Sequence, residues 1–223
     1  MNVSFSFLSA PLNLNPNNPC ILCIENRVLL RDVITAFFNE RTLEEGICFW
    51  QDETELKFKG NICFVGNIFE LKTPASVLKK MHENLARFCN SEMLNETLNL
   101  KTVILNYLDI LVRNYDYDFE YSVDVSPIDL FKMQDLRPLL TNEDFPQSLL
   151  SYLLFLRQYA GIKCFVIAHL HSYFTSEELE RFYKEIAYRD ICLFLLESEQ
   201  NFEPLPCERV SIVDSDLCEI LAN

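Results

Sequence analysis

Two kinds of hydrophobic periodicity divide the chain. Near both ends, apolar residues run without interruption or alternate with polar ones, which is typical of β-strands. These segments are CILCIEN (20–26), ICFWQD (47–52), ELKFKG (55–60), NICFVGN (61–67), KCFVIAHL (163–170), ICLFLLES (191–198) and CERVSIVD (207–214). Apolar residues three and four positions apart predict helices over 28–41, 73–90, 92–115, 126–133, 145–161 and 175–190. Strands therefore gather at the ends and helices in the middle.

Several predicted helices carry signals at their ends. Thr73 followed by Pro74 indicates an N-cap and a first helical residue, and Ser126 with Pro127 repeats the pattern. Thr175 and Glu178 have the spacing of a capping box. Gly161 is placed to end the fifth helix. A further short strand is expected where DYDFEYSVDV (116–125) alternates.

The order of these elements predicts an α/β fold in two parts. Residues 1–71 and 150–223 form an α/β head, and residues 72–149 form an α-helical leg inserted into it. The segment between the strand NICFVGN (61–67) and the first helix of the leg lacks glycine after Gly66, and the chain has four glycines in all. Neither GxGxxG nor GxxxxGK[ST] occurs. We therefore expect no ATP hydrolysis through a phosphate loop. The motif GxSxG is also absent, so we expect no nucleophile elbow of the kind found in α/β-hydrolases.

Composition limits the class of protein. Apolar residues make up 49% of the 223 residues, enough for a sizeable core, and the net charge is −14. A general basic coat for nucleic acid is excluded, so a nucleic-acid site must be a local patch. The N-terminus lacks the basic and apolar regions of a signal peptide, and no apolar run is long enough to span a bilayer. Nine cysteines, mostly in apolar strands, suit reduced thiols in a cytoplasm.

Histidine and paired cysteine are weak candidates for metal ligands. Cys20 and Cys23 form one CxxC without a second pair, so buried thiols on opposite faces of a strand are the alternative to a zinc or redox site. His169 and His171 are expected on one face where a strand ends, as half of a metal site or as two solvated residues. His82, among charged residues on a helix, is expected at the surface.

One window of the chain is strongly basic. Between residues 57 and 80 there are five lysines and one acid, Glu70. The lysines are Lys57, Lys59, Lys72, Lys79 and Lys80. Such a patch can contact phosphates and release their condensed counterions, or it can simply be a solvated face of an ordinary domain.

One short segment is strongly acidic. In an extended strand Asp116, Asp118 and Glu120 would project to one side, with Asp124 following. Three carboxylates on one side repel unless a cation neutralises them, and Ca²⁺ prefers such oxygen ligands. An exposed acidic strand is the alternative, since the spacing is not that of an EF-hand loop.

Three segments together resemble one family. NIFELKTPASVLKKMHENL (67–85), DYDFEYSVDVSPIDLFK (116–132) and the stretch from KCFVIAHL to ICLFLLES (163–198) are similar to the short form of a type II-A CRISPR-associated adaptation protein, the Csn-two family. The resemblance implies an α/β head related to nucleotide-hydrolase folds but lacking the phosphate loop, and a helical leg. It also implies a homotetrameric ring that is supported by Ca²⁺. Ends of double-stranded DNA would pass through the central hole of this ring without sequence preference.

The resemblance also implies that the protein is not an enzyme. It implies a role in spacer acquisition with the integrase complex and the RNA-guided nuclease of the same locus, in a bacterial cytoplasm. The family segment D-[LF]-E-Y matches Asp118 to Tyr121, which makes Asp116, Asp118, Glu120 and Asp124 the calcium candidates. Leu111 and Asn114 stand where familiar members have acids. The lysine of the first leg helix matches Lys79, and the other lysines of the window follow from electrostatics.

Two other functions remain open at this point. A divergent metal-dependent nuclease would use Asp116, Asp118 and Glu120 with Mg²⁺ or Mn²⁺. A protein-binding scaffold would use the acidic surface as its interface. Cleavage of DNA would favour the nuclease, and no DNA binding at any salt concentration would favour the scaffold.

Overall fold

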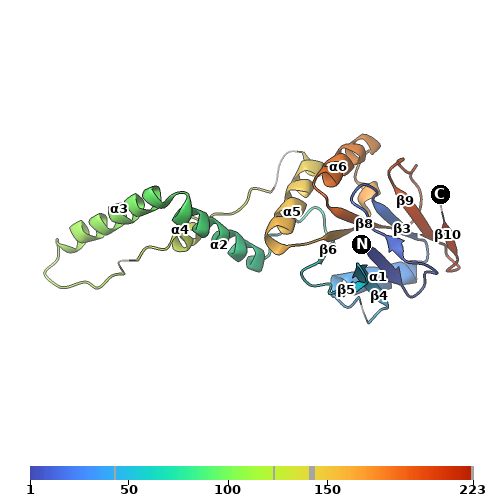
Figure 1. Cartoon of the computed structure of the whole chain (residues 1–223), viewed down its shortest axis with the longest axis horizontal. Coiled ribbons are helices and arrows are strands. Elements are labelled where there is room, and N and C mark those ends of the chain that lie inside the picture. Colours follow the sequence, from blue (N-terminus) through green and yellow to red (C-terminus); the bar gives the residue numbers. More distant parts are fainter. Residues whose placement is uncertain (43, 123, 141–143, 222–223) are drawn as a thin grey trace. The chain divides into compact units, whose positions relative to one another are not determined.

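The structure, a computed structural model, divides the chain into two compact units (Figure 1). It describes residues 1–42, 44–122, 124–140 and 144–221. The head comprises residues 1–72 and 140–223, and the leg comprises residues 73–139. The leg therefore ends before the boundary at residue 149 that the sequence indicated. The predicted boundary falls inside the helix Phe145–Ala160, whose Leu149 and Leu150 are buried in the head.

A six-stranded mixed sheet forms the centre of the head. Its strand order is β10-β9-β3-β8-β7-β6, with every neighbouring pair parallel except β9 and β10. The strands are β3 (Cys20–Ile24), β6 (Ile62–Val65), β7 (Cys164–Ala168), β8 (Cys192–Glu197), β9 (Arg209–Val213) and β10 (Glu219–Leu221). β3, β7 and β8 are almost wholly buried, as parallel strands covered on both faces must be. The predicted α/β class is confirmed.

A smaller antiparallel sheet packs with helix α1 (Arg27–Phe38) on one face of the large sheet. Its order is β2-β1-β4-β5, from β1 (Asn2–Phe5), β2 (Leu12–Asn13), β4 (Ile47–Gln51) and β5 (Thr54–Leu56). Phe37 of α1 lies at the centre, with its ring 6.2 Å from Phe49 and 6.4 Å from Phe194. This aromatic cluster joins the two sheets through one apolar core.

Helices α5 (Phe145–Ala160) and α6 (Ser176–Tyr188) pack together beside β8. Gly161 ends α5 in the left-handed conformation, with φ 77°, and the predicted capping box of Thr175 and Glu178 opens α6. A short 3₁₀ helix, η1 (Leu170–Ser172), follows β7. Helix α6 and η1 supply Tyr183 and His171 to the buried polar site described below.

The turn from β3 to α1 is short, and a side chain of the turn accepts hydrogen bonds from the backbone N–H groups that begin the helix. Only Glu25 and Asn26 separate the two elements. The side chain of Asn26 accepts hydrogen bonds from the backbone N–H groups of Val28 and Leu29, at 3.1 and 3.0 Å. The free N–H groups at the start of α1, which in a phosphate loop would face a phosphate, are thus partly occupied by the cap.

The leg contains α2 (Ala75–Ser91), α3 (Leu94–Val112) and α4 (Pro127–Met133). Ser126 caps α4 as predicted, but α2 starts one residue later than expected, with Pro74 in the cap position and no side-chain cap. The segment expected as a strand at 116–125 is irregular in its described residues, because no neighbouring strand is present to pair with it; Val123 lies outside the described residues.

The expectation that His82 lies at the surface is wrong. This residue of α2 is 6% exposed, its Nε2 donates to the carbonyl of Leu136 at 2.8 Å, and its ring lies 5.7 Å from that of Phe131. α4 and the segment after it cover the histidine, which the sequence around α2 does not reveal.

The nine cysteines, all among the described residues, are free thiols. Cys20 and Cys23 are both buried in β3, and burial is the main cause that raises the pKa of each to about 12. Such thiols are inert at neutral pH. Within the part of the chain that the structure describes, no helix is both long and apolar enough to cross a membrane.

Candidate functional site

Three of the predicted lysines belong to the head. Lys57 and Lys59 flank Phe58, whose ring lies 6.1 Å from Phe37 in the core. Because Phe58 anchors this loop inward, the two lysines on either side are exposed. Lys72 is also exposed and pairs with Glu70 at 2.5 Å. Exposed lysines of this kind are free to exchange a weak surface partner for a phosphate.

The structure adds one cation to this group that the sequence did not indicate. The backbone N–H of Lys163 donates to the carbonyl of Asn61 at 2.7 Å, and the Asn61 side chain donates to the carbonyl of Lys57 at 2.9 Å. Lys163 therefore lies beside the loop of Lys57 and Lys59, although more than one hundred residues separate them. Its ammonium donates to Gln51 at 3.0 Å. Parallel pairing of β6 with β7 creates this proximity.

The other two predicted lysines lie on α2 of the leg. Lys79 and Lys80 are consecutive and exposed, and Lys79 has a distant partner in Glu83, at 3.8 Å. Lys79 and Lys132 line a pocket of about 410 Å³ between α2 and α4, with Leu78 and Ile128 among its apolar walls. The rim of this pocket carries two lysines together with the acidic Glu83.

The acidic segment is exposed and does not form the one-sided row that a strand would give. Asp116, Asp118 and Glu120 are exposed, and Asp124 pairs with Lys101 of α3 at 3.3 Å. Within the described residues, no three His, Cys, Asp or Glu side chains are arranged to hold a metal ion. A calcium site built from these carboxylates would need ligands from outside one chain, or a rearrangement of the segment.

Aromatic rings alternate with these acids. Tyr115, Tyr117 and Phe119 are exposed and lie 4.9–5.6 Å apart between ring centroids. Tyr121 donates a short hydrogen bond to Asp109 of α3, and this bond is the main cause that raises the pKa of the tyrosine. These ring contacts hold the segment against itself and against the end of α3.

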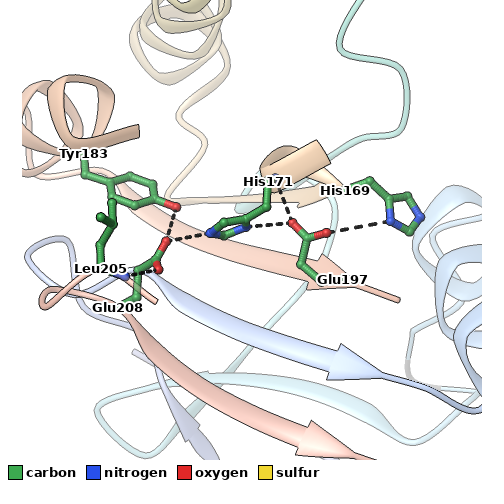
Figure 2. A network of polar contacts seen from close by, with 6 residues as sticks. All are labelled: His169, His171, Tyr183, Glu197, Leu205 and Glu208. Atoms are coloured by element: carbon green, nitrogen blue, oxygen red, sulfur yellow. Dashed lines mark hydrogen bonds and ion pairs between the residues drawn. The ribbon is translucent and has the colours of Figure 1, made fainter. Parts of the chain in front are cut away.

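A buried polar network lies between β7, β8, α6 and the segment that leads to β9 (Figure 2). His171 Nδ1 contacts Glu197 Oε1 at 2.9 Å, and His171 Nε2 contacts Glu208 Oε1 at 2.8 Å. The side chains of the three residues are only 5%, 4% and 0% exposed, in the order His171, Glu197, Glu208. Carboxylates accept at both ring nitrogens, so the ring donates twice and is an imidazolium.

Further donors satisfy the two carboxylates. The backbone N–H of His171 donates to Glu197 at 3.0 Å. Glu208 accepts from the hydroxyl of Tyr183 at 2.7 Å and from the backbone N–H of Leu205 at 2.8 Å. Burial, then the Glu208 carboxylate, raises the pKa of Tyr183 well above its usual value, which keeps the phenol protonated as a donor. Such full pairing is what a buried charged group requires.

The two histidines do not lie on one strand face, contrary to the sequence-based expectation. β7 ends at Ala168, and His169 adopts the left-handed conformation with φ 59°, which turns the chain into η1. His169 is 35% exposed with its Nδ1 3.8 Å from Glu197 Oε2, whereas His171 is buried. Sequence reasoning missed both glutamates because they follow in the chain by 26 and 37 residues.

Comparison with known proteins places the chain in a class. The sequence profile of the CRISPR-associated protein family Cas_Csn2 matches residues 41–217, which is most of the chain. No curated protein sequence matches it. Among solved structures it is similar to one described as an ABC transporter ATP-binding protein from Pyrococcus furiosus, with 10% identity, a TM-score of 0.35 and 94% of each chain covered.

The chain is therefore a CRISPR-associated protein with an α/β head. It belongs to the Csn2 family, which implies a role in CRISPR adaptation.

Proposed function

We propose that the protein is a non-enzymatic, sequence-independent binder of double-stranded DNA ends that acts as a homotetrameric ring during spacer acquisition. The observation that carries the proposal is the match of residues 41–217 to the Csn2 family. In the cell it would work in the bacterial cytoplasm with the integrase complex and the RNA-guided nuclease of its locus. The short turn of Glu25 and Asn26, in place of a phosphate loop, supports a role without nucleotide hydrolysis.

The charge distribution supports DNA binding by a local patch. The chain carries a net charge of −14, so contact with a phosphate backbone requires that its few cations be concentrated. Lys57, Lys59, Lys79 and Lys80 are exposed, and ring symmetry would repeat them four times around a central hole. Contacts to phosphates position a duplex without reading its sequence.

The surface of α3 supports self-association. None of its residues, all of which are described, is buried. Leu100, Val103, Tyr107 and Ile110 are all exposed apolar side chains, spaced by three and four residues, which places them along one stripe. A helix without a fully buried side chain gains comparatively little from packing within its own chain, so a second copy of the chain is the occupant we propose for this stripe.

Calcium is proposed as the structural cofactor of the ring. The carboxylates of Asp116, Asp118 and Glu120 are exposed and form no ion pair among the described residues. Asp124 forms one ion pair, with Lys101. Since one chain does not bring three of them together, carboxylates from adjacent subunits would complete the coordination shell.

Ring closure predicts a preference for free DNA ends. We expect linear duplex DNA to bind at least tenfold more tightly than a closed circle of the same sequence at low salt, because only an end can enter a closed ring. Fluorescence anisotropy of labelled linear DNA, competed by either form, measures the ratio. Equal competition would contradict threading. Cleavage that disappears in Asp118→Ala would favour the nuclease, and no binding at any salt concentration would favour the scaffold.

The calcium assignment predicts a mass that depends on the ion. By light scattering on a sizing column, we expect about four times the chain mass of 26.1 kDa in Ca²⁺ and a lower mass after chelation. The matched variant is Asp118→Asn, which should behave in Ca²⁺ as the chelated protein does. Four chains in both conditions would contradict the calcium site, and a monomer in both would contradict the ring.

A further inference from the structure

The connection from β8 to β9 is unusual for two strands that run the same way. β3 lies between them in the sheet, so residues 198–208 must pass β3 to reach the start of β9. Such crossovers are usually helices that pack an apolar face on the sheet. This one has no helix or strand, contains Pro204 and Pro206, and is exposed over residues 198–201. We call residues 198–208 the strap.

Two side chains of the strap hold it to the head, and both meet His171. The ring of Phe202 stacks on the imidazole, with 3.8 Å between centroids and 17° between planes. Glu208, at the end of the strap, accepts from Nε2 of the same ring at 2.8 Å. On the opposite edge of the ring, Nδ1 donates to Glu197 at the end of β8. His171 thus joins both ends of the crossover (Figure 2).

The positive charge of His171 is what makes this arrangement stable. Apart from the two histidines, no basic side chain among the described residues pairs with Glu197 or Glu208. If the ring lost its proton, one nitrogen would become an acceptor facing a buried carboxylate oxygen, which is repulsive. We propose that His171 is a charge-dependent clasp that fastens the strap, so that its deprotonation at alkaline pH opens the connection between β8 and β9.

The groups facing the clasp come from every element packed around it. β8 supplies Glu197, the strap supplies Glu208, and α6 supplies the protonated hydroxyl of Tyr183. His169 lies 3.8 Å from the outer oxygen of Glu197. From β3, Cys23 is near enough for Glu197, Glu25 and Glu208 to raise its pKa. Burial, then the Glu208 carboxylate, raises the pKa of Cys207 in the strap, with smaller opposing effects of Glu180 and Lys184 of α6. The surroundings are therefore mainly acidic, which favours the imidazolium.

Burial and charge oppose each other at the ring. Burial alone lowers the pKa of His171, but the hydrogen bonds and charges of Glu197 and Glu208 outweigh it and raise the pKa to about 9. The folded value thus lies above the ordinary 6.5. The stabilisation is complete below pH 6.5, weakens as the pH rises, and is lost above pH 9. Glu197 stays beside the ring when the strap opens, so only the part of this stabilisation that comes from Glu208 is lost on opening, and opening should increase at least tenfold between pH 7 and pH 10.

Cleavage by chymotrypsin after Phe202 tests the clasp in the whole protein. This bond is protected while Phe202 stacks on His171, so its cleavage reports the open population. Mass spectrometry identifies the cut, and a free peptide of residues 198–208 corrects for protease activity at each pH. We expect cleavage of the wild-type protein to rise at least tenfold from pH 7 to pH 10.

Two variants separate the clasp from its neighbour. His171→Gln keeps a polar side chain without a charge, and we expect at least tenfold faster cleavage at pH 7 and no further pH response. His169→Gln, which alters the half-exposed histidine of the same network, should behave as wild type. The proposal is overturned if His171→Gln is cleaved like wild type at both pH values. If that variant does not fold, NMR titration of the wild-type ring decides: a midpoint above pH 8 supports the clasp, and one near 6.5 refutes it.

Discussion

Replacing Lys79 and Lys80 together with Glu will lower the affinity for linear duplex DNA on the order of 100-fold at low salt. Both side chains are exposed on α2, and each copy of a ring would lose two phosphate contacts and gain two repulsive charges. The slope of log affinity against log salt concentration should become shallower, because fewer counterions are released. Fluorescence anisotropy across a salt series measures both quantities.

A charge-matched control makes this result specific. Arg181→Glu with Lys184→Glu changes the net charge by the same amount on α6 of the head, where both residues are exposed. We expect this variant to bind within a few-fold of wild type. Equal losses in the two double variants would show that net charge alone governs binding, and unchanged binding in Lys79→Glu/Lys80→Glu would remove α2 from the interface. Circular dichroism verifies that both variants are folded.

Replacing Glu208 with Ala will lower the free energy of unfolding of the head by about 3–5 kcal/mol. The substitution leaves a buried imidazolium with one carboxylate, and it removes the acceptor of Tyr183 and of the Leu205 N–H. Folded proteins have a total free energy of unfolding of about 5–15 kcal/mol, so this loss is a large fraction of the stability. Urea denaturation followed by the fluorescence of Trp50, the single tryptophan, reports the head because Trp50 lies in β4.

Glu219→Ala is the matched control for burial. Glu219 also accepts two hydrogen bonds from a distant segment, from the backbone N–H and the hydroxyl of Ser9, but it lies near solvent. Water replaces the lost partner there, so we expect a loss of about 1 kcal/mol or less. A loss below about 1 kcal/mol for Glu208→Ala as well would mean that the buried network contributes little to stability.

The elements of the head were largely predictable because their signals are local. The strands around Cys164–Ala168 and Cys192–Glu197 are continuous apolar runs, and the capping box of Thr175 is a four-residue pattern. The alternation of DYDFEYSVDV is equally local, yet the described residues there form no strand. A strand is stabilised by its neighbours, so alternation without a partner predicts exposure but not pairing.

Contacts between distant segments could not be predicted from spacing. His171 meets Glu197 and Glu208 only because β7 and β8 are adjacent and the strap returns past β3. Lys163 joins the loop of Lys57 through pairing of β6 with β7. His82 is buried because α4 and the residues after it cover α2. In each case the partner is set by strand order or helix packing.

By itself, the sequence determined the fold class, which is an α/β head with an inserted helical leg, and the membership of the Csn2 family. It also determined that the chain has one strongly basic and one strongly acidic window. These follow from periodicity, composition and short motifs, which depend on neighbours in the chain. The tertiary structure alone decided that no residue of α3 is fully buried and that an imidazolium fastens the strap. The reason is physical: burial and ion pairing depend on which distant segments the fold brings into contact.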